Sequence, residues 1–125
     1  MKDKESSISI LLIAIDQLSK LLVVSVGFPV VYNRGIAFSL LGGINPIFIA
    51  LILIVLARSY RNNFWFGFII AGGAANLIDR IRLGYVIDFI NLGFWPVFNL
   101  ADVFITIGVL AIIIVNMKEK YESNY

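Results

Sequence analysis

The sequence predicts an all-α membrane protein in which four transmembrane helices are joined by short connections. Composition is the first reason: 60% of the 125 residues are hydrophobic and 14% are charged, whereas about a quarter of residues are charged in ordinary soluble domains. The second reason is that the apolar residues gather in four segments, separated by glycine, proline and polar residues. Such a chain has room for several spans of roughly 20 residues but not for an added soluble domain.

We expect one integral membrane domain, residues 1–125, with spans at about residues 8–26, 45–57, 64–78 and 99–117. The first span is retained rather than cleaved as a signal peptide, because Asp16 and Lys20 interrupt its apolar run and no small-residue cleavage site follows. These two residues lie four positions apart on one helix face, acid first. This order favours an ion pair that points into the helix bundle, and we interpret both as structural.

The loop after the first span contains residues that favour extended structure, among them Val31 and Tyr32. We expect a small strand or flap at the membrane face, in which Gly35 gives the backbone freedom. Asn33 is either a simple turn residue or an amide that offers a donor and an acceptor to an extended peptide. The second span then begins with Asn45 as its N-cap, followed by proline in the first turn.

The third span contains small residues at 71–75 (AGGAA), which allow close approach of a neighbouring helix. It forms a hairpin with the second span, because the polar link at 58–63 is too short to cross a membrane. The fourth span begins within FNLAD, in which Asn99 is expected as N-cap and Asp102 as the third helical residue of a capping box. This capping role accounts for an acid at position 102 without any catalytic function.

An even number of spans places both termini on one side of the membrane. Lys and Arg number six on that side, in the two terminal segments and the 58–63 link, and three on the other. The positive-inside rule therefore predicts cytoplasmic termini. The polar stretch at residues 76–102 then lies near the outer leaflet.

Composition also limits the chemistry. The chain has no Cys and no His, which excludes thiolate nucleophiles, disulfides, a His general base and the usual zinc sites. The net charge is +2, but the basic residues are scattered and form no stripe for nucleic acid. We expect neither a metal nor a cofactor, so any catalysis must rest on carboxylates, Lys, Ser, Thr, Tyr or water.

Residues 76–102 hold three of the eight acids in a strongly apolar setting. Asp88 lies in an apolar, extended-looking run (YVIDFIN) where an acid has no local task. Together with Asp102 it suggests an aspartic-protease type of acid pair, because two close carboxylates share one proton. Membrane acids also serve as proton or ion carriers, which is the alternative from chemistry alone.

Two further residues of this stretch share a helical face, since Asn76 and Arg80 are four positions apart. Arg80 can bind a substrate carbonyl or a lipid headgroup. It can equally pair with Asp79 or Asp102 and orient the site.

Five motifs now occur in a characteristic order: DQLSK (16–20), YNRGIAFS (32–39), GGAANLIDR (72–80), GYVIDFI (84–90) and FNLAD (98–102). In this order, and over most of the chain, they resemble the lipoprotein signal peptidase family, signal peptidase II. The resemblance implies four transmembrane helices with a small extracytoplasmic β-like cradle, and an aspartyl endopeptidase whose acid pair is Asp88 and Asp102. The residues that line the site would be Asn33, Gly35, Asn76, Arg80 and Asn99.

The implied substrates are diacylglyceryl-modified prolipoproteins, cut just before the lipid-modified Cys, and the implied partners are these substrates and membrane lipid. No nucleic acid is involved, and a monomer suffices because four spans enclose one acid pair. Two departures stand out: Ala75 occupies a position where the family usually has Gly, and only 14 positions separate Asp88 from Asp102, which leaves few residues for a lid.

Two competing classes remain. Small four-helix transporters of the multidrug-resistance kind have a similar length and an acid in the first span, and Asp16 would then be the proton-coupled residue. A non-enzymatic subunit of a membrane assembly is the third hypothesis, but it leaves the paired acids unexplained.

Overall fold

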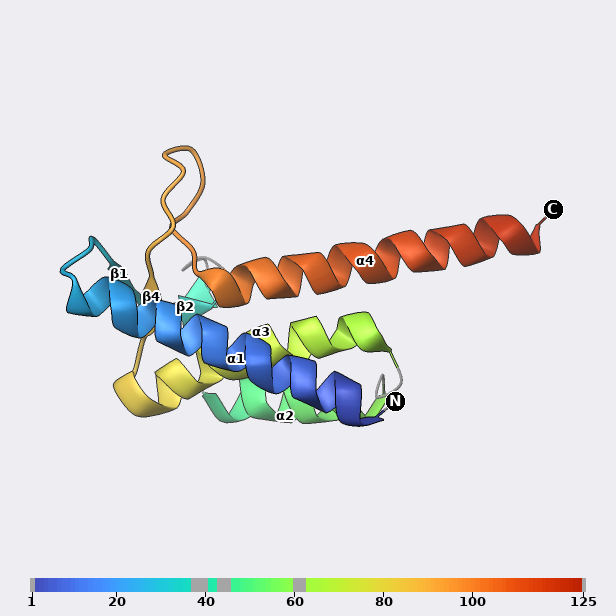
Figure 1. Cartoon of the computed structure of the whole chain (residues 1–125), viewed down its shortest axis with the longest axis horizontal. Coiled ribbons are helices and arrows are strands. Elements are labelled where there is room, and N and C mark those ends of the chain that lie inside the picture. The colour runs from blue at the N-terminus through green and yellow to red at the C-terminus, as the bar shows by residue number, and fades with distance from the viewer. Residues whose placement is uncertain (1, 37–40, 43–45, 60–62, 125) are drawn as a thin grey trace.

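The computed structural model describes residues 2–36, 41–42, 46–59 and 63–124. Four helices run in alternating directions, so that the N- and C-termini lie toward the same end of the molecule (Figure 1). The helices are α1 (Lys2–Ser25), α2 (Pro46–Ser59), α3 (Phe64–Leu83) and α4 (Leu100–Ser123).

Three of these helices are long and apolar enough to cross a membrane: Ser6–Ser25 within α1, all of α3 and all of α4. The helix α2 has 14 residues, which at 1.5 Å per residue is about 21 Å, less than the roughly 30 Å of a hydrocarbon core. The described residues therefore establish three membrane-capable helices, and a fourth transmembrane helix is not confirmed. The expected cap of α2, Asn45, lies outside the described residues.

The helix α3 is central and packs against α1, α2 and α4. Its small residues allow this, as the AGGAA pattern predicts. A Cβ atom at Gly72 would overlap the carbonyl oxygen of Ala101 in α4, and one at Gly73 would lie 2.5 Å from Cδ2 of Leu53 in α2. The backbones of α3 and α4 are thus in direct contact at Gly72.

Both ends of α3 are defined by local signals. The side chain of Asn63 caps the start by accepting a hydrogen bond from the backbone N–H of Trp65, and Gly84 ends the helix with a φ of 79°. The helix continues five residues beyond the expected span end at Ile78, because no breaker occurs before Gly84. The polar residues at 76–82 are consequently helical.

Two small antiparallel sheets lie beside the helices. The first pairs β1 (Val31–Asn33) with β4 (Val86–Asp88), which places Val31 opposite Asp88. The second pairs β2 (Gly35–Ile36) with β3 (Leu41–Gly42). These sheets match the strand expected after the first span, and the pairing with β4 joins that loop to the segment after α3. The loop between β4 and α4 projects away from the bundle (Figure 1).

Burial is inverted relative to a soluble protein. Large apolar side chains on the outer helix faces are exposed, for example Leu21 at 66% and Ile114 at 64%. Polar side chains occupy much of the interior. Among the described residues the buried polar or charged ones are Asp16, Lys20, Asn33, Asn76, Asp79, Asp88 and Asn99. This is the pattern of helices whose outer faces contact lipid while their polar groups satisfy one another inside.

Candidate active site

Asp88 and Asp102 meet at a shared partner, Asn99. The acid of β4 accepts a hydrogen bond from the side-chain Nδ2 of Asn99 at 2.8 Å. The acid in the first turn of α4 accepts one from the backbone N–H of Asn99 at 3.0 Å, and its own N–H donates to Asn99 Oδ1 at 3.0 Å. These last two bonds form the predicted capping box. Asn99 therefore joins Asp88 of β4 to Asp102 in the first turn of α4.

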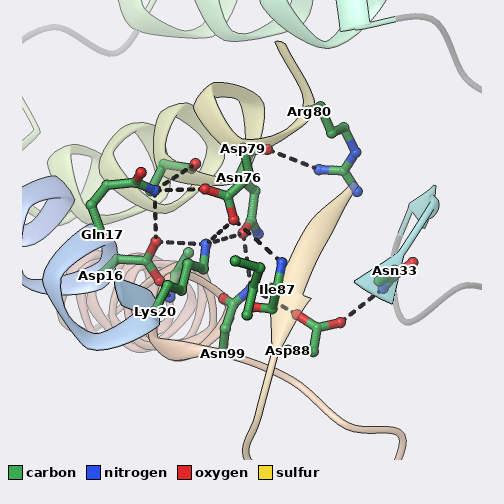
Figure 2. Close-up of polar contacts among 12 residues, drawn as sticks. Asp16, Gln17, Lys20, Asn33, Asn76, Asp79, Arg80, Ile87, Asp88 and Asn99 are labelled. Atoms are coloured by element: carbon green, nitrogen blue, oxygen red, sulfur yellow. Dashed lines mark hydrogen bonds and ion pairs between the residues drawn. The ribbon is translucent and has the colours of Figure 1, made fainter. Parts of the chain in front are cut away.

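Asp88 is fixed from its other side by Asn33, whose Nδ2 donates to Oδ2 at 3.0 Å (Figure 2). The backbone N–H of Gly35 donates to Asn33 Oδ1 at 2.8 Å. Asn33 ends the strand β1, and its amide serves Asp88 in this structure, so its contact with an extended peptide stays a prediction. The antiparallel pairing of β1 with β4 brings it to the acid.

Asp102 receives a second donor from α3, because Asn76 Nδ2 donates to its Oδ1 at 3.1 Å. Asn76 Oδ1 in turn accepts from Asn99 Nδ2 at 3.0 Å. Asp102 also borders a cavity of about 310 Å³ between α4 and the loop that precedes it. The other lining residues are Leu92, Phe94, Trp95, Phe98, Val103, Thr106 and Ile107. A reactant that enters this largely apolar cavity reaches one of the two carboxylates.

The environment of Asp88 favours its protonated form. Burial raises the pKa of this carboxyl from 3.8 to about 6, and the negative charge of Asp102 acts in the same direction. Hydrogen bonds from Asn33 and Asn99 oppose the rise. A carboxyl with such a pKa can hold a proton under mildly acidic conditions while a neighbouring carboxylate is ionised.

Arg80 joins the two small sheets, β1 with β4 and β2 with β3, which we call the cradle, to the helices. Its Nη2 donates to the carbonyl oxygen of Gly35 and its Nη1 to the carbonyl oxygen of Asn76, the latter at 3.4 Å. In the part of the chain that the structure describes, these carbonyls accept its hydrogen bonds, and neither Asp79 nor Asp102 forms an ion pair with it. Arg80 thereby holds the cradle against α3 beside the acids.

Behind the acids lies a buried ionic cluster, which we call the Lys20 cluster: Asp16, Gln17, Lys20 and Asp79. Lys20 Nζ lies 2.6 Å from Asp16 Oδ2 and 2.8 Å from Asp79 Oδ2. The predicted pair of Asp16 with Lys20 is therefore present and points inward. Asp16 Oδ1 also accepts the backbone N–H of Ala101 at 2.8 Å. With both oxygens engaged and no exposed surface, Asp16 is poorly suited to carry protons.

Sequence reasoning missed two members of this cluster. Gln17 Nε2 donates to Asp79 Oδ1 at 2.9 Å, and Asp79 is the second carboxylate paired with Lys20. One signal was available: Asp79 follows Asn76 by three positions, so both lie on the same face of α3. No such signal exists for Gln17, because its partners lie about 60 positions away in the chain.

Asp16→Asn is expected to lower chiefly the stability of the protein. It removes a buried partner of Lys20, and hydrogen bonds to charged groups are worth about 1.5–3 kcal/mol. Thermal unfolding of the purified protein in detergent measures this loss. Glu122→Gln, the same change in an exposed pair with Lys118, is the control and should leave stability nearly unchanged. A fully stable but inactive Asp16→Asn protein would contradict the structural role.

Comparisons with known proteins show the family to which this chain belongs. The model of the family described as signal peptidase (SPase) II matches residues 8–118. The chain is 35% identical to a lipoprotein signal peptidase of Streptococcus agalactiae, over 94% of both chains, and 36% identical to one of Moorella thermoacetica, over 82% of this chain and 85% of that one.

Among solved structures, a bacterial membrane enzyme determined at 2.3 Å resolution is 27% identical and superposes with a TM-score of 0.81, over 94% of this chain and 90% of its own. A second bacterial membrane enzyme, at 1.9 Å, is 26% identical with a TM-score of 0.78, over 93% of this chain and 94% of that one. With a family match over most of its length and three membrane-capable helices, the chain belongs to the signal peptidase II family of multi-pass membrane peptidases.

Proposed function

We propose that this protein is an aspartyl endopeptidase of the cytoplasmic membrane, which removes the signal peptide from diacylglyceryl-modified prolipoproteins just before the lipid-modified Cys. The observation that carries the proposal is the convergence of Asp88 and Asp102 on Asn99, next to an apolar cavity. The relatives are lipoprotein signal peptidases by name, which supports the choice of substrate.

The proposed chemistry uses water and the two acids. One carboxylate takes a proton from a water molecule, whose oxygen attacks the scissile carbonyl carbon. The other acid, protonated, donates a hydrogen bond to the carbonyl oxygen as negative charge develops there. The proton held by the first acid then passes to the leaving nitrogen, the C–N bond breaks, and no covalent enzyme intermediate forms. Asn33, Asn76 and Asn99 hold the acids in place, and Arg80 braces the cradle above them.

The same proposal places both termini in the cytoplasm and the acid pair near the outer leaflet. Two observations support it. The distribution of Lys and Arg favours cytoplasmic termini. The termini lie toward the same end of the molecule, while β4 and the start of α4, the elements that carry Asp88 and Asp102, lie toward the other (Figure 1). In this proposal α2 is the fourth span and the substrate approaches the cradle from the outer leaflet. The enzyme acts as a monomer.

Cleavage is expected to fall as pH rises through about 6. The reaction needs one proton on the acid pair, and the raised pKa of Asp88, about 6, means that this proton is kept below that pH and lost above it. The quantity to measure is kcat/KM, which reports the free enzyme and should decline roughly tenfold per pH unit on the basic side. A kcat/KM that rises through pH 6 to a plateau would contradict the assignment of the proton.

The direct test is cleavage of a purified, diacylglyceryl-modified prolipoprotein by the purified enzyme in detergent, followed by gel shift and mass spectrometry of the products. The expected result is a product whose N-terminal residue is the lipid-modified Cys. The same substrate without its lipid should be cleaved far more slowly. Cleavage at another bond, or no cleavage, would overturn the proposed substrate.

A further inference from the structure

Two of the three asparagines around the acid pair are oriented by backbone groups. Asn33 Oδ1 accepts the N–H of Gly35, so its Nδ2 must face Asp88. Asn99 Oδ1 accepts the N–H of Asp102, so its Nδ2 also faces Asp88. An amide whose oxygen is held by a fixed donor cannot turn that oxygen toward a carboxylate. The backbone therefore determines that these amides present N–H groups to the acid.

Asn76 has no such backbone donor in the described hydrogen bonds, and Lys20 takes that place. Lys20 Nζ donates to Asn76 Oδ1 at 3.2 Å, with Asn99 Nδ2 as the second donor at 3.0 Å. An ammonium group has three donors and no acceptor, so it can face only the amide oxygen. The amide nitrogen of Asn76 is thereby directed at Asp102 Oδ1.

Lys20 itself is beyond the reach of substrate. Its exposed fraction is 2%, and Asp16 and Asp79 flank its ammonium group at 2.6 and 2.8 Å. It is held rigidly between α1 and α3, one amide away from the acid pair. Its one hydrogen bond toward the acid pair is made to Asn76, and its positive charge also acts on both acids.

We propose that Lys20 is a positioning residue of the acid pair: through Asn76 it keeps an N–H donor on Asp102, so that Asp102 is the ionised acid that activates water and Asp88 is the acid that carries the proton. The assignment of Lys20 to catalysis rests on the proposed peptidase function, whereas its control of the Asn76 amide does not. Asp102 additionally lies in the first turn of α4, where the helix dipole favours an anion.

Several charged groups surround Asp102 and bear on its ionisation. They come from every element packed around it: Asp16 and Lys20 from α1, Asp79 and Arg80 from α3, and Asp88 from β4. A variant that removes Lys20 alone changes the charge of this group as well as the hydrogen bond. The test must therefore keep the charge constant.

The charge-balanced variant is Lys20→Met/Asp79→Asn. The Lys20 cluster carries one positive and two negative charges, and the double variant leaves one negative charge, so its net charge stays at minus one. Asp16 keeps its hydrogen bond from the N–H of Ala101. The control is Asp79→Asn, which retains Lys20 and its bond to Asn76.

The first measurement does not need substrate. In protein labelled with ¹⁵N on asparagine, the side-chain N–H signals of Asn76, identified by their loss in Asn76→Asp, report whether the amide donates to a carboxylate. We expect one proton signal shifted downfield in the wild type and in Asp79→Asn, and a shift back toward the free-amide position in the double variant. Unchanged Asn76 signals in the folded double variant would overturn the proposal, whether or not the protein cleaves prolipoproteins.

The second measurement is the pH profile of kcat. Without Lys20, the Asn76 oxygen keeps only its bond from Asn99 Nδ2, a donor group that also serves Asp88. The amide is then held less firmly and can turn its oxygen toward Asp102, which favours the protonated acid. The acidic limb of the double variant should therefore move up by about one pH unit, and kcat should fall about 10- to 100-fold with little change in KM. Asp79→Asn makes the Lys20 cluster less negative, so its acidic limb should not move up from the wild-type position. A loss of stability with the limb unmoved would show a purely structural role and overturn the proposal.

A rescue variant keeps the proposal testable if the double variant does not fold. Lys20→Arg keeps donors without acceptors at this position, so it should retain the downfield Asn76 signal and the wild-type acidic limb. A folded Lys20→Arg protein that keeps the signal but shows the displaced limb would also overturn the proposal, because the effect would then bypass Asn76.

Discussion

Asp88→Asn is expected to abolish prolipoprotein cleavage, with kcat reduced by about 10³-fold or more. The amide has nearly the shape of the carboxyl group but can neither hold nor release the shared proton, and general acid–base groups contribute about 10²- to 10⁴-fold. Asp102→Asn should be equally inactive. Both proteins should remain folded in the membrane, which gel filtration in detergent and thermal unfolding can verify.

The matched control is Glu119→Gln, the same acid-to-amide change at an exposed position of α4, which should cleave at the wild-type rate. Wild-type activity in Asp88→Asn would mean that the chemistry is right but this acid is not part of it. Cleavage by no protein, wild type included, would overturn the proposed substrate.

Gly72→Ala should have a second large effect, on assembly of the site. Its new methyl group would overlap the carbonyl oxygen of Ala101, which is backbone and cannot turn away. Overpacking of this kind costs about 1–3 kcal/mol. Asn76 lies one turn beyond Gly72, and Asp102 follows Ala101, so separation of α3 and α4 should lengthen the bond between Asn76 and Asp102 and lower cleavage at least tenfold.

Gly73→Ala is the neighbouring control, because its methyl group would meet the end of the flexible Leu53 side chain. Thermal unfolding in detergent and the cleavage rate should change much less in this variant than in Gly72→Ala. Equal losses in the two variants would mean that local crowding around α3, and not the contact of α3 with α4, determines the outcome.

The features that sequence predicts well here are local. The capping box at Asn99 and Asp102 can be recognised because its partners lie three positions apart, and the ion pair of Asp16 with Lys20 because they lie four apart on a helix. The end of α3 is a case in between: Gly84 was recognisable as a breaker, but the apolar pattern alone stopped the span at Ile78.

Long-range partners were beyond sequence reasoning. The pairing of β1 with β4 joins Val31 to Asp88 across more than fifty positions, and nothing in either tripeptide specifies the other. The partners of Arg80 are backbone carbonyls, which carry no sequence signature at all. Family resemblance indicated that Asn33, Asn76 and Asn99 line the site, but not which acid each amide contacts.

The bond from the N–H of Ala101 to Asp16 joins the last helix to the first, and this has a consequence for biosynthesis. Ribosomes deliver α1, the cradle and α3 to the membrane before α4 exists. Until then Asp16 has no N–H from Ala101 to accept, Asp88 lacks Asn99, and Asp102 has not been made. Under the proposed mechanism, a nascent chain is therefore incapable of hydrolysis, and we expect proteolytic competence to arise in a single final step, when the C-terminal helix docks.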